Sequence, residues 1–260
     1  MSFHEKDELR YYSFDTFSES ITQAIFTRRG GISPAPWASL NVGGSVGDDP
    51  THVAENRLRS FRLMGRDPAS IHDVWLVHST DIVYADAPHL LEKPSTKADI
   101  LLTDNPEVTL FMRFGDCTPI FFHDPVKQVI GISHAGWMGT LKGVATETVQ
   151  AMRNRYGCSP EDIIAGIGPT IGVDHYEVGP EVISQFVSAF GGDADRIIEV
   201  RNGSTYLDLW TANYIQLVNA GVGQVEISGI CTACHLDDWF SHRAEKGKTG
   251  RFGALMALST

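Results

Sequence analysis

Apolar, β-branched runs of strand length recur along the whole chain, separated by amphipathic or turn-rich segments. Such runs predict β-strands. They cover Ile21–Arg28, Asp73–His78, Ile82–Asp86, Asp99–Leu102, Val108–Phe114, Ile120–His123, Val129–Ser133, Ile163–Gly168, Val225–Ile230 and Gly253–Leu258. Several of these runs follow one another with no helical segment between them, so we expect a mixed rather than a purely parallel arrangement of strands.

Other segments have the periodicity of amphipathic helices. They are Thr51–Met64, Thr140–Met152, Pro180–Phe190 and Leu209–Ala220. Asp48 and Asp49 precede the first of these as capping residues, and Asp208 precedes the last. No repeat or charged linker divides the chain. We therefore expect a single compact domain over residues 1–260, of the α/β or α+β class.

The composition narrows the class of protein. Hydrophobic residues make up 42% and charged residues 20% of the chain, as in ordinary globular proteins. The formal net charge of −11 argues against a nucleic-acid partner, because a phosphate backbone binds a basic surface. No run approaches the length of a membrane span, and the N-terminal MSFHEKDELRYY lacks the apolar core of a secretory signal. With only four cysteines, we expect reduced thiols and a cytoplasmic protein with no membrane partner.

Three metal-binding residue types interrupt the apolar strand ends. His78 ends the run VWLVH, Cys117 lies between FMRFGD and TPIFF, and His134 ends VIGISH. Neighbouring strands bring their tips together, so these side chains are candidates for one site. Three protein ligands from separate strands leave one tetrahedral position open, which is the pattern of a catalytic rather than a structural zinc site.

The same three residues fit other roles. A lone histidine on a strand is more often a hydrogen-bonded structural residue, and a lone cysteine is more often a small buried hydrophobe. Cys117 with His78 or His134 also forms a candidate nucleophile pair for a hydrolase or transferase that needs no metal.

A separate segment, Cys231-Thr-Ala-Cys234-His235, matches the C-x-x-C-H pattern of c-type haem attachment. Haem attachment of that kind requires export, for which the sequence shows no signal. We therefore expect ordinary loop thiols here and no haem, with a redox C-x-x-C pair as a further option.

Asn41, Arg57, Arg243 and Arg251 are candidates for polar contacts to a substrate. Asn41 lies in the glycine-rich loop SLNVGGSVGDD, where the backbone can approach a ligand, and Arg57 follows on the next predicted helix. The alternative for each arginine is a solvated surface position.

Long segments of the chain together resemble the laccase-domain (polyphenol oxidoreductase-like) proteins. These segments are FTRRGGIS, WASLNVGGSVGDDP followed by ENR, the Val77-His78 step, ADILLT, GDCTPIFFHDP, HAGW, IGPTIGVDHYEVGPEV, LDLWTANYIQLVNAGV, CTACHLDDWFSHR and TGRFG. They occur in the order typical of that family and cover almost the whole chain.

The resemblance implies both a fold and an activity. It implies mixed β-sheets sandwiched by helices, and purine nucleoside phosphorylase, methylthioadenosine phosphorylase and adenosine deaminase activities. Carried over position by position, the zinc ligands of the family fall on His78, Cys117 and His134. The resemblance also places Asn41 and Arg57 near the site. It identifies CTACH as a variant of the family's Cys-Thr (CT) segment.

Two positions depart from the family pattern. The family usually has QVHG around its first histidine, where this chain has LVHS with Leu76 and Ser79. It usually has arginine after HAGW, where this chain has Met138. Loss of a guanidinium removes a bidentate anion contact, so phosphorolysis would suffer more than deamination unless Arg113 or another residue substitutes.

The sequence thus predicts a Zn²⁺ enzyme whose partners are a purine nucleoside and phosphate, with His78, Cys117 and His134 also forming the catalytic centre. The first alternative is a copper-dependent polyphenol oxidoreductase, since two imidazoles and a thiolate also suit Cu²⁺. However, the chain has ten histidines and none of the H-x-H pairs typical of multicopper oxidases. The second alternative is the metal-free Cys-His hydrolase. The sequence leaves open whether the chain forms a homo-oligomer.

Overall fold

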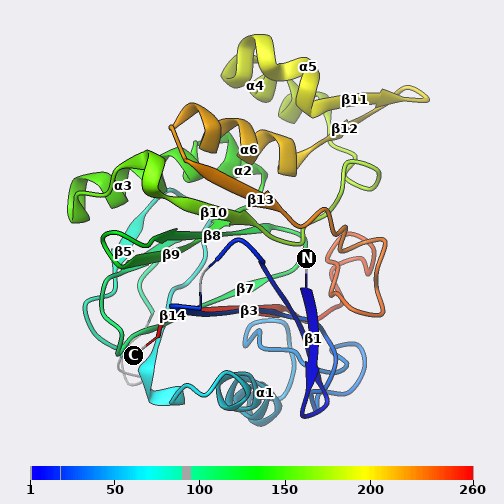
Figure 1. Ribbon diagram of the computed structural model, residues 1–260. Coiled ribbons are helices and arrows are strands. Elements are labelled where there is room, and N and C mark those ends of the chain that lie inside the picture. Colours follow the sequence, from blue (N-terminus) through cyan, green and yellow to red (C-terminus); the bar gives the residue numbers. More distant parts are fainter. Residues whose placement is uncertain (1, 18, 90–94, 260) are drawn as a thin grey trace.

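The computed structural model describes residues 2–17, 19–89 and 95–259. Two mixed β-sheets pack face to face, with helices covering the outer face of each (Figure 1). This confirms the predicted class of a single compact α/β domain with mixed sheets sandwiched by helices. Within the described ranges, no helix is long and apolar enough to cross a membrane.

The first sheet contains both ends of the described chain. Its strand order is β1 (Ser2–Lys6), β2 (Leu9–Ser13), β3 (Ile21–Phe26), β14 (Phe252–Leu258), β7 (Thr109–Phe114) and β4 (Ile71–Asp73). Its neighbouring strands are antiparallel except for the parallel pair β4 and β7. Helix α1 (Pro50–Leu63) covers its outer face, where Phe61 packs against Phe111 with ring centroids 5.6 Å apart.

The second sheet supports the candidate site. Its order is β13 (Gln224–Ile227), β10 (Ile164–Ile167), β8 (Thr118–Asp124), β9 (Val129–Ala135), β6 (Ile100–Thr103) and β5 (Ile82–Tyr84). The parallel pairs lie at its two edges, and the central pairs are antiparallel. Every residue of β8 and β9 is buried, because one face meets the first sheet and the other meets helices.

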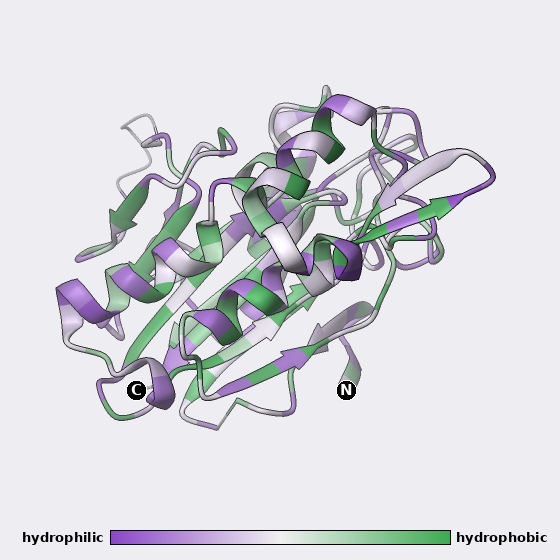
Figure 2. Cartoon of the chain, turned by 90° about the horizontal axis from the view of Figure 1, so that it is seen from above, coloured by the Kyte–Doolittle hydropathy of each residue, from purple (hydrophilic) through white to green (hydrophobic). Residues whose placement is uncertain are grey.

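Helices α2 (Trp137–Leu141), α3 (Val144–Tyr156) and α6 (Leu209–Asn219) cover the outer face of the second sheet (Figure 1). An outermost group packs on α6 and consists of α4 (Pro180–Phe190), α5 (Ala194–Ile197) and the hairpin of β11 (Ile198–Arg201) and β12 (Ser204–Leu207). Short 3-10 turns occur at Pro68–Ser70, Pro160–Asp162 and Gly191–Asp193. Seen from above, the helices alternate between hydrophilic and hydrophobic colour, as expected for elements with one buried face (Figure 2).

The predicted caps are confirmed where the helices begin. The Asp49 carboxylate accepts a hydrogen bond from the Thr51 N–H at 2.8 Å, and the Asp208 carboxylate accepts one from the Thr211 N–H at 3.0 Å. Asp48 is not the cap of α1. Its carboxylate is buried and accepts hydrogen bonds from Asn41 and Ser33 instead.

Two predicted segments are wrong in their extent. The strand expected over Asp73–His78 ends at Asp73, because the chain leaves the first sheet there and crosses to the second. The helix expected over Thr140–Met152 is divided at Gly143, whose φ of 83° lies in the left-handed region and separates α2 from α3. The hairpins of β1 with β2 and of β11 with β12 were not predicted, because these strands are short and β1 is mostly exposed and polar.

Candidate functional site

His78, Cys117 and His134 converge at one end of the second sheet. One potential ligand atom from each residue lies within 4.8 Å of the other two. The Cys117 Sγ lies 3.9 Å from the His78 Nε2, and the two imidazole ring centroids are 4.9 Å apart. The structure therefore brings together the three residues that were predicted as ligands.

The β8–β9 pairing brings Cys117 and His134 together. In its antiparallel register, Pro119 lies opposite His134. Cys117 is two residues before Pro119, so its side chain points to the same face of the sheet, diagonally across from the imidazole. His134 is buried, and Cys117 is partly exposed at the strand tip. One side of the site is thus fixed by the rigid centre of a sheet.

His78 reaches the site from the crossing segment rather than from a strand. Its φ of 59° is in the left-handed region, which is uncommon for a residue with a side chain. The Asp99 Oδ2 holds the backbone on both sides of this residue, accepting hydrogen bonds from the Val77 N–H at 3.1 Å and the Ser79 N–H at 2.7 Å. These hydrogen bonds hold the backbone in place of the interstrand hydrogen bonds that a paired strand would have formed.

Asp99 also orients the second histidine. Its other carboxylate oxygen lies 2.8 Å from the His134 Nδ1, which leaves Nε2 as the nitrogen available to a metal. Asp99 is fully buried and immediately precedes β6. A carboxylate behind a ligating imidazole fixes the tautomer and raises the basicity of the ligand. Sequence reasoning missed Asp99, although a buried carboxylate at the start of the apolar run ADILLT was a signal that could have found it.

The electrostatics of the cluster favour an ionised thiol. Burial alone raises the pKa of Cys117, but the charge and hydrogen bonding of His134 and His78 outweigh it and lower that pKa to about 6. Burial likewise acts to lower the pKa of His134, yet Cys117 and Asp99 raise it above its ordinary value. Asp99 stays ionised because hydrogen bonds from His134, Ser79 and Val77 lower its pKa to about 2 against the effect of burial. These shifts describe a thiolate beside a protonated imidazole, and such a group can hold a metal ion once the proton on the His134 Nε2 leaves.

Gly136 lines the cluster closely enough to give a test of its geometry. A Cβ at this position would lie 2.8 Å from the Cys117 Sγ and 3.0 Å from the His78 Cδ2. The backbone, with φ −73° and ψ 176°, accepts any residue, so Gly136→Ala acts through these contacts alone. We expect turnover of the reaction catalysed at this cluster to fall on the order of 10²-fold, with unchanged far-UV circular dichroism, because the Cys117 and His78 side chains are displaced. Gly192→Ala, where a Cβ meets nothing within 4 Å, is the control and should leave turnover unchanged.

The wall of the site beside Cys117 carries two cations. Burial lowers the pKa of the Arg251 guanidinium, and the nearby negative charges of Cys117 and Asp116 oppose that effect. Arg251 is held by the carbonyl of Gly250 at 2.8 Å. The Arg243 guanidinium lies 5.1 Å from the Tyr176 ring centroid, and its backbone N–H donates to Asp116 at 2.6 Å. The site therefore has a positively charged and aromatic side.

Arg57 and Arg113 lie around Asp73 at the edge of the first sheet. The Arg57 Nε donates to the Val42 carbonyl at 3.0 Å, and the Arg113 Nη1 donates to the Asp73 carboxylate at 2.9 Å. Burial, followed by the repulsion from Arg113, lowers the pKa of Arg57 to about 10. Contact of Arg57 with a substrate remains a prediction.

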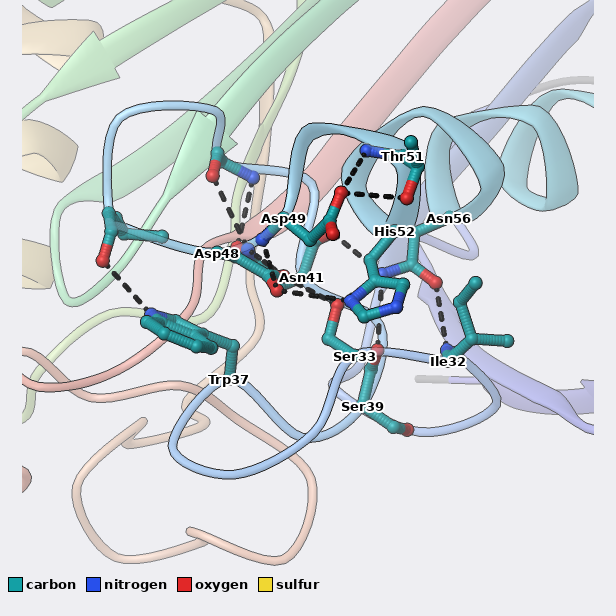
Figure 3. Close-up of polar contacts among 12 residues, drawn as sticks. Ile32, Ser33, Trp37, Ser39, Asn41, Asp48, Asp49, Thr51, His52 and Asn56 are labelled. Carbon is teal, nitrogen blue, oxygen red and sulfur yellow. Dashed lines mark hydrogen bonds and ion pairs between the residues drawn. The ribbon is translucent and has the colours of Figure 1, made fainter.

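Asn41 is fully buried in a polar network that joins the glycine-rich loop to α1 (Figure 3). Its Nδ2 donates to the Asp48 carboxylate at 2.8 Å, and its Oδ1 accepts from the backbone N–H groups of Gly43 and Arg251. Asn56 donates to the Asn41 carbonyl at 2.8 Å. Asn41 thus positions the Arg251 backbone, while direct contact of its side chain with a substrate remains a prediction.

Because this network is buried, its disruption should cost stability. We expect Asn41→Ala to lower the free energy of unfolding by about 2–4 kcal/mol, since it leaves the Gly43 and Arg251 N–H groups without an acceptor. Urea denaturation measures the change. Asn154→Ala, at an exposed position of α3, is the matched control, with an expected change within about 0.5 kcal/mol. Equal midpoints for the two variants would refute the role given to the Asn41 network.

Asp116 and His123 are two further titratable residues in the segment around Cys117. Asp116 adjoins Cys117, but both of its oxygens accept hydrogen bonds, from the Thr232 hydroxyl and from the Arg243 N–H. His123 is fully buried beside Phe17, six residues along β8 from Cys117, which is about 20 Å in an extended strand. His123 therefore lies away from the cluster.

Met138 lies in the first turn of α2, directly after the loop that follows His134. A lysine lies close to the cluster in the same region. The Lys142 ammonium donates to the His78 carbonyl at 2.9 Å. Arg113, by contrast, is paired with Asp73. Lys142 and Arg251, rather than Arg113, thus supply positive charge near the cluster.

The sequence is similar to named proteins over nearly its whole length. Residues 22–259 match the family described as "Multi-copper polyphenol oxidoreductase laccase". A Deinococcus radiodurans protein named purine nucleoside phosphorylase is 39% identical over 239 residues, which cover 92% of this chain and 90% of that protein. The Bacillus subtilis purine nucleoside phosphorylase YlmD is 32% identical over 250 residues, with coverage of 93% and 90%.

The fold is shared with solved structures. The Bacillus licheniformis hypothetical protein YfiH superposes with a TM-score of 0.92 at 32% identity, covering 99% of both chains. YlmD from Geobacillus stearothermophilus gives a TM-score of 0.93 at 31% identity, again with 99% of both chains covered. The similarity thus extends to the whole domain.

Proposed function

We propose, from the premise that this chain belongs to the multi-copper polyphenol oxidoreductase laccase family, that it is a purine nucleoside phosphorylase. The observation that carries this proposal is the similarity to relatives of that name, 39% and 33% identical over at least 90% of both chains. The site supports it with a metal-binding cluster beside two arginines and a tyrosine, which suits an anionic co-substrate and an aromatic base.

We further propose that His78, Cys117 and His134 hold a Zn²⁺ ion. The donor set fits, because it has one thiol of lowered pKa and two imidazoles, one of them backed by the Asp99 carboxylate. When bound, the ion supplies a Lewis acid that stabilises negative charge developing on the substrate. Three protein ligands would leave one coordination position for a reactant.

The residues of the chain itself bind and orient the reactants. Arg251 and Arg243 attract phosphate and align it with ribose C1′, while the Tyr176 ring offers an apolar face to the nucleoside. Phosphate oxygen then bonds to C1′ as the C1′–N9 bond breaks, and the purine leaves with the electron pair and takes up the proton that hydrogen phosphate gives up on becoming the sugar phosphate dianion. The cationic wall stabilises the phosphate throughout, because its guanidinium groups are fixed before the reaction.

Adenosine, inosine and methylthioadenosine are the proposed substrates, with deamination of adenosine as a second activity of the same site. In deamination, water replaces the C6 amino group, and no phosphate is required. Met138 favours retention of this second activity, because the arginine usual at that position in relatives would serve the phosphate.

The products formed from adenosine test both activities. Purified protein is incubated with adenosine in the presence and absence of phosphate, and the products are identified by mass. We expect adenine and ribose 1-phosphate only when phosphate is present, and inosine under either condition. If metal-loaded protein forms none of these products, the proposal is wrong.

Two other functions predict different behaviour. A copper-dependent phenol oxidase would oxidise phenols and contain copper, which metal analysis and a phenol assay measure. Among the described residues, one candidate metal group contains two histidines and the other contains one. Each number is smaller than a trinuclear copper cluster requires. A Cys-His hydrolase would survive chelation but not alkylation of Cys117.

Arg251 should contribute to phosphate use rather than to metal binding. We expect Arg251→Gln to lower kcat/KM for phosphate roughly 10- to 100-fold, corresponding to a lost charge-assisted hydrogen bond of about 1.5–3 kcal/mol. Steady-state kinetics with varied phosphate measure the change. Arg153→Gln, at an exposed position of α3, is the control with no expected effect. An unchanged phosphate dependence in Arg251→Gln would exclude this residue from phosphate binding.

A further inference from the structure

A second group of metal-binding side chains lies outside the site described above. Asp174, His175, Cys231 and Cys234 each place a potential ligand atom within 4.8 Å of the other three. The two cysteines come from the C-x-x-C segment after β13, and the other two residues come from the turn after β10. The C-x-x-C segment singled out in the sequence therefore meets a histidine and a carboxylate from a distant part of the chain.

The separations between the His175 nitrogen and the two sulfurs are those of a tetrahedral site, and those to the Asp174 oxygen are slightly shorter. The His175 Nδ1 lies 3.7 Å from the Cys231 Sγ, 3.5 Å from the Cys234 Sγ and 3.0 Å from the Asp174 Oδ2. The Cys234 Sγ lies 3.1 Å from the same Asp174 oxygen. Zinc–ligand bonds of about 2.0–2.3 Å at tetrahedral angles put ligand atoms roughly 3.3–3.8 Å apart. One ion at the centre would need only small shifts of these side chains.

The surroundings of Cys231 add an independent feature. The Gly172 N–H donates a hydrogen bond to the Cys231 Sγ at 3.2 Å. Backbone donors to sulfur stabilise a thiolate and orient it, as second-shell groups do around metal-bound cysteines. A Cβ at Gly172 would lie 2.5 Å from the Asp174 Oδ1 and 3.2 Å from the Cys231 Sγ, so a side chain there would displace the Asp174 carboxylate and crowd the Cys231 sulfur.

We propose that Asp174, His175, Cys231 and Cys234 bind a second Zn²⁺ ion, as a structural site. Two thiolates, an imidazole and a carboxylate complete a tetrahedron, and four protein ligands leave no position for a substrate. The cysteines lose their protons to solvent when the ion binds. All four cysteines of the chain are free thiols in the structure, so the pair is available as ligands.

The second ion joins two loops that shape the reaction site. The turn containing His175 continues into Tyr176, and the segment containing Cys231 continues into Thr232, whose hydroxyl donates to Asp116 at 2.6 Å. Asp116 in turn fixes the Arg243 backbone and precedes Cys117. The ion thus holds the aromatic and cationic wall against the first cluster without touching the reactants.

The number of zinc ions per chain tests the proposal independently of catalysis. The full-length protein and its variants are loaded with Zn²⁺, dialysed against metal-free buffer and analysed by mass spectrometry for zinc per chain. We expect two ions in the wild type, one in Cys117→Ala, one in Cys234→Ala and none in the double variant. Cys158→Ala, a control at a buried thiol in the core beside α3, should keep two.

X-ray absorption of Cys117→Ala identifies the ligands of the remaining ion. We expect two sulfur neighbours at about 2.3 Å and two lighter neighbours at about 2.0–2.2 Å. His175→Ala provides a second variant should Cys234→Ala fail to fold, as judged by circular dichroism, and it should also lose one ion. The proposal is overturned if Cys234→Ala and His175→Ala each hold as much zinc as the wild type, or if Cys117→Ala holds none. A disulfide between Cys231 and Cys234 in the zinc-loaded protein would also overturn it. Absence of phosphorylase activity would leave these zinc counts unchanged and would contradict only the proposed function.

Discussion

Replacing Cys117 with alanine is expected to abolish phosphorolysis and to empty the cluster that it forms with His78 and His134. Cys117 is the only anionic donor in this cluster, and its thiol ionises readily because the imidazoles lower its pKa to about 6. Without it, two imidazoles remain, and metal affinity should fall by more than the roughly 100-fold effect seen when outer-shell partners are lost. Zinc binding at this cluster and turnover of adenosine with phosphate measure the two losses.

Cys158→Ala is the matched control for this experiment. Cys158 is buried in the core beneath α3, so the substitution removes a thiol and some packing without altering the cluster. We expect turnover of Cys158→Ala to match the wild type at temperatures where both are folded. Undiminished turnover in Cys117→Ala would refute the assignment of Cys117 to the reaction site.

Asp99→Asn should have the second largest effect. The substitution keeps the size of the side chain but removes its negative charge. In the wild type, one carboxylate oxygen faces the His134 Nδ1, and the other accepts hydrogen bonds from the Val77 and Ser79 N–H groups. An amide NH₂ placed against these donors would lose hydrogen bonds on at least one side. Because Asp99 positions two of the three ligands, we expect metal affinity to fall about 10- to 100-fold.

Competition with a chromophoric chelator measures this change in affinity. Asp81→Asn is the control, since Asp81 has an exposed side chain and directly precedes β5, where only its backbone carbonyl meets the Asp99 segment. We expect its affinity to equal that of the wild type. Should Asp99→Asn bind zinc as tightly as Asp81→Asn, the carboxylate has no part in holding the histidines.

The sequence was sufficient to find the three clustered residues. Each belongs to a residue type that commonly binds metals and lies at the end of an apolar run, and the family resemblance pointed to the same positions. Asp99 was missed because its partners are a histidine 35 residues away and two backbone N–H groups of the crossing segment. Contacts of that kind arise only when β6 pairs with β9 and the crossing segment packs beside them, and no local pattern in the sequence records them.

The errors in the predicted elements have similar causes. The apolar periodicity of Thr140–Met152 continues across the break at Gly143, since Leu141 before it packs against α4 and α6, while the apolar residues of α3 after it pack on the second sheet. The run Asp73–His78 is apolar enough for a strand, but only Ile71–Asp73 pairs with β7. The hydrophobic pattern does not distinguish a paired strand from a crossing segment, which here is mostly only partly buried and leaves Trp75 exposed.

Side-chain roles were harder to predict than positions. Asn41 was selected because a glycine-rich loop can approach a ligand, yet its amide is used within the network of Figure 3. The C-x-x-C-H segment was considered as haem attachment or as loop thiols. Its meeting with Asp174 and His175 depends on the pairing of β10 with β13, which local sequence does not specify.

The most direct test of the proposed function follows phosphate-dependent cleavage of adenosine as the metal is removed and restored. Protein stripped by a chelator should form no ribose 1-phosphate, and addition of Zn²⁺ should restore the product in the wild type but not in Cys117→Ala. Continued formation of ribose 1-phosphate by stripped protein, or its absence from zinc-loaded wild-type protein, would contradict the account.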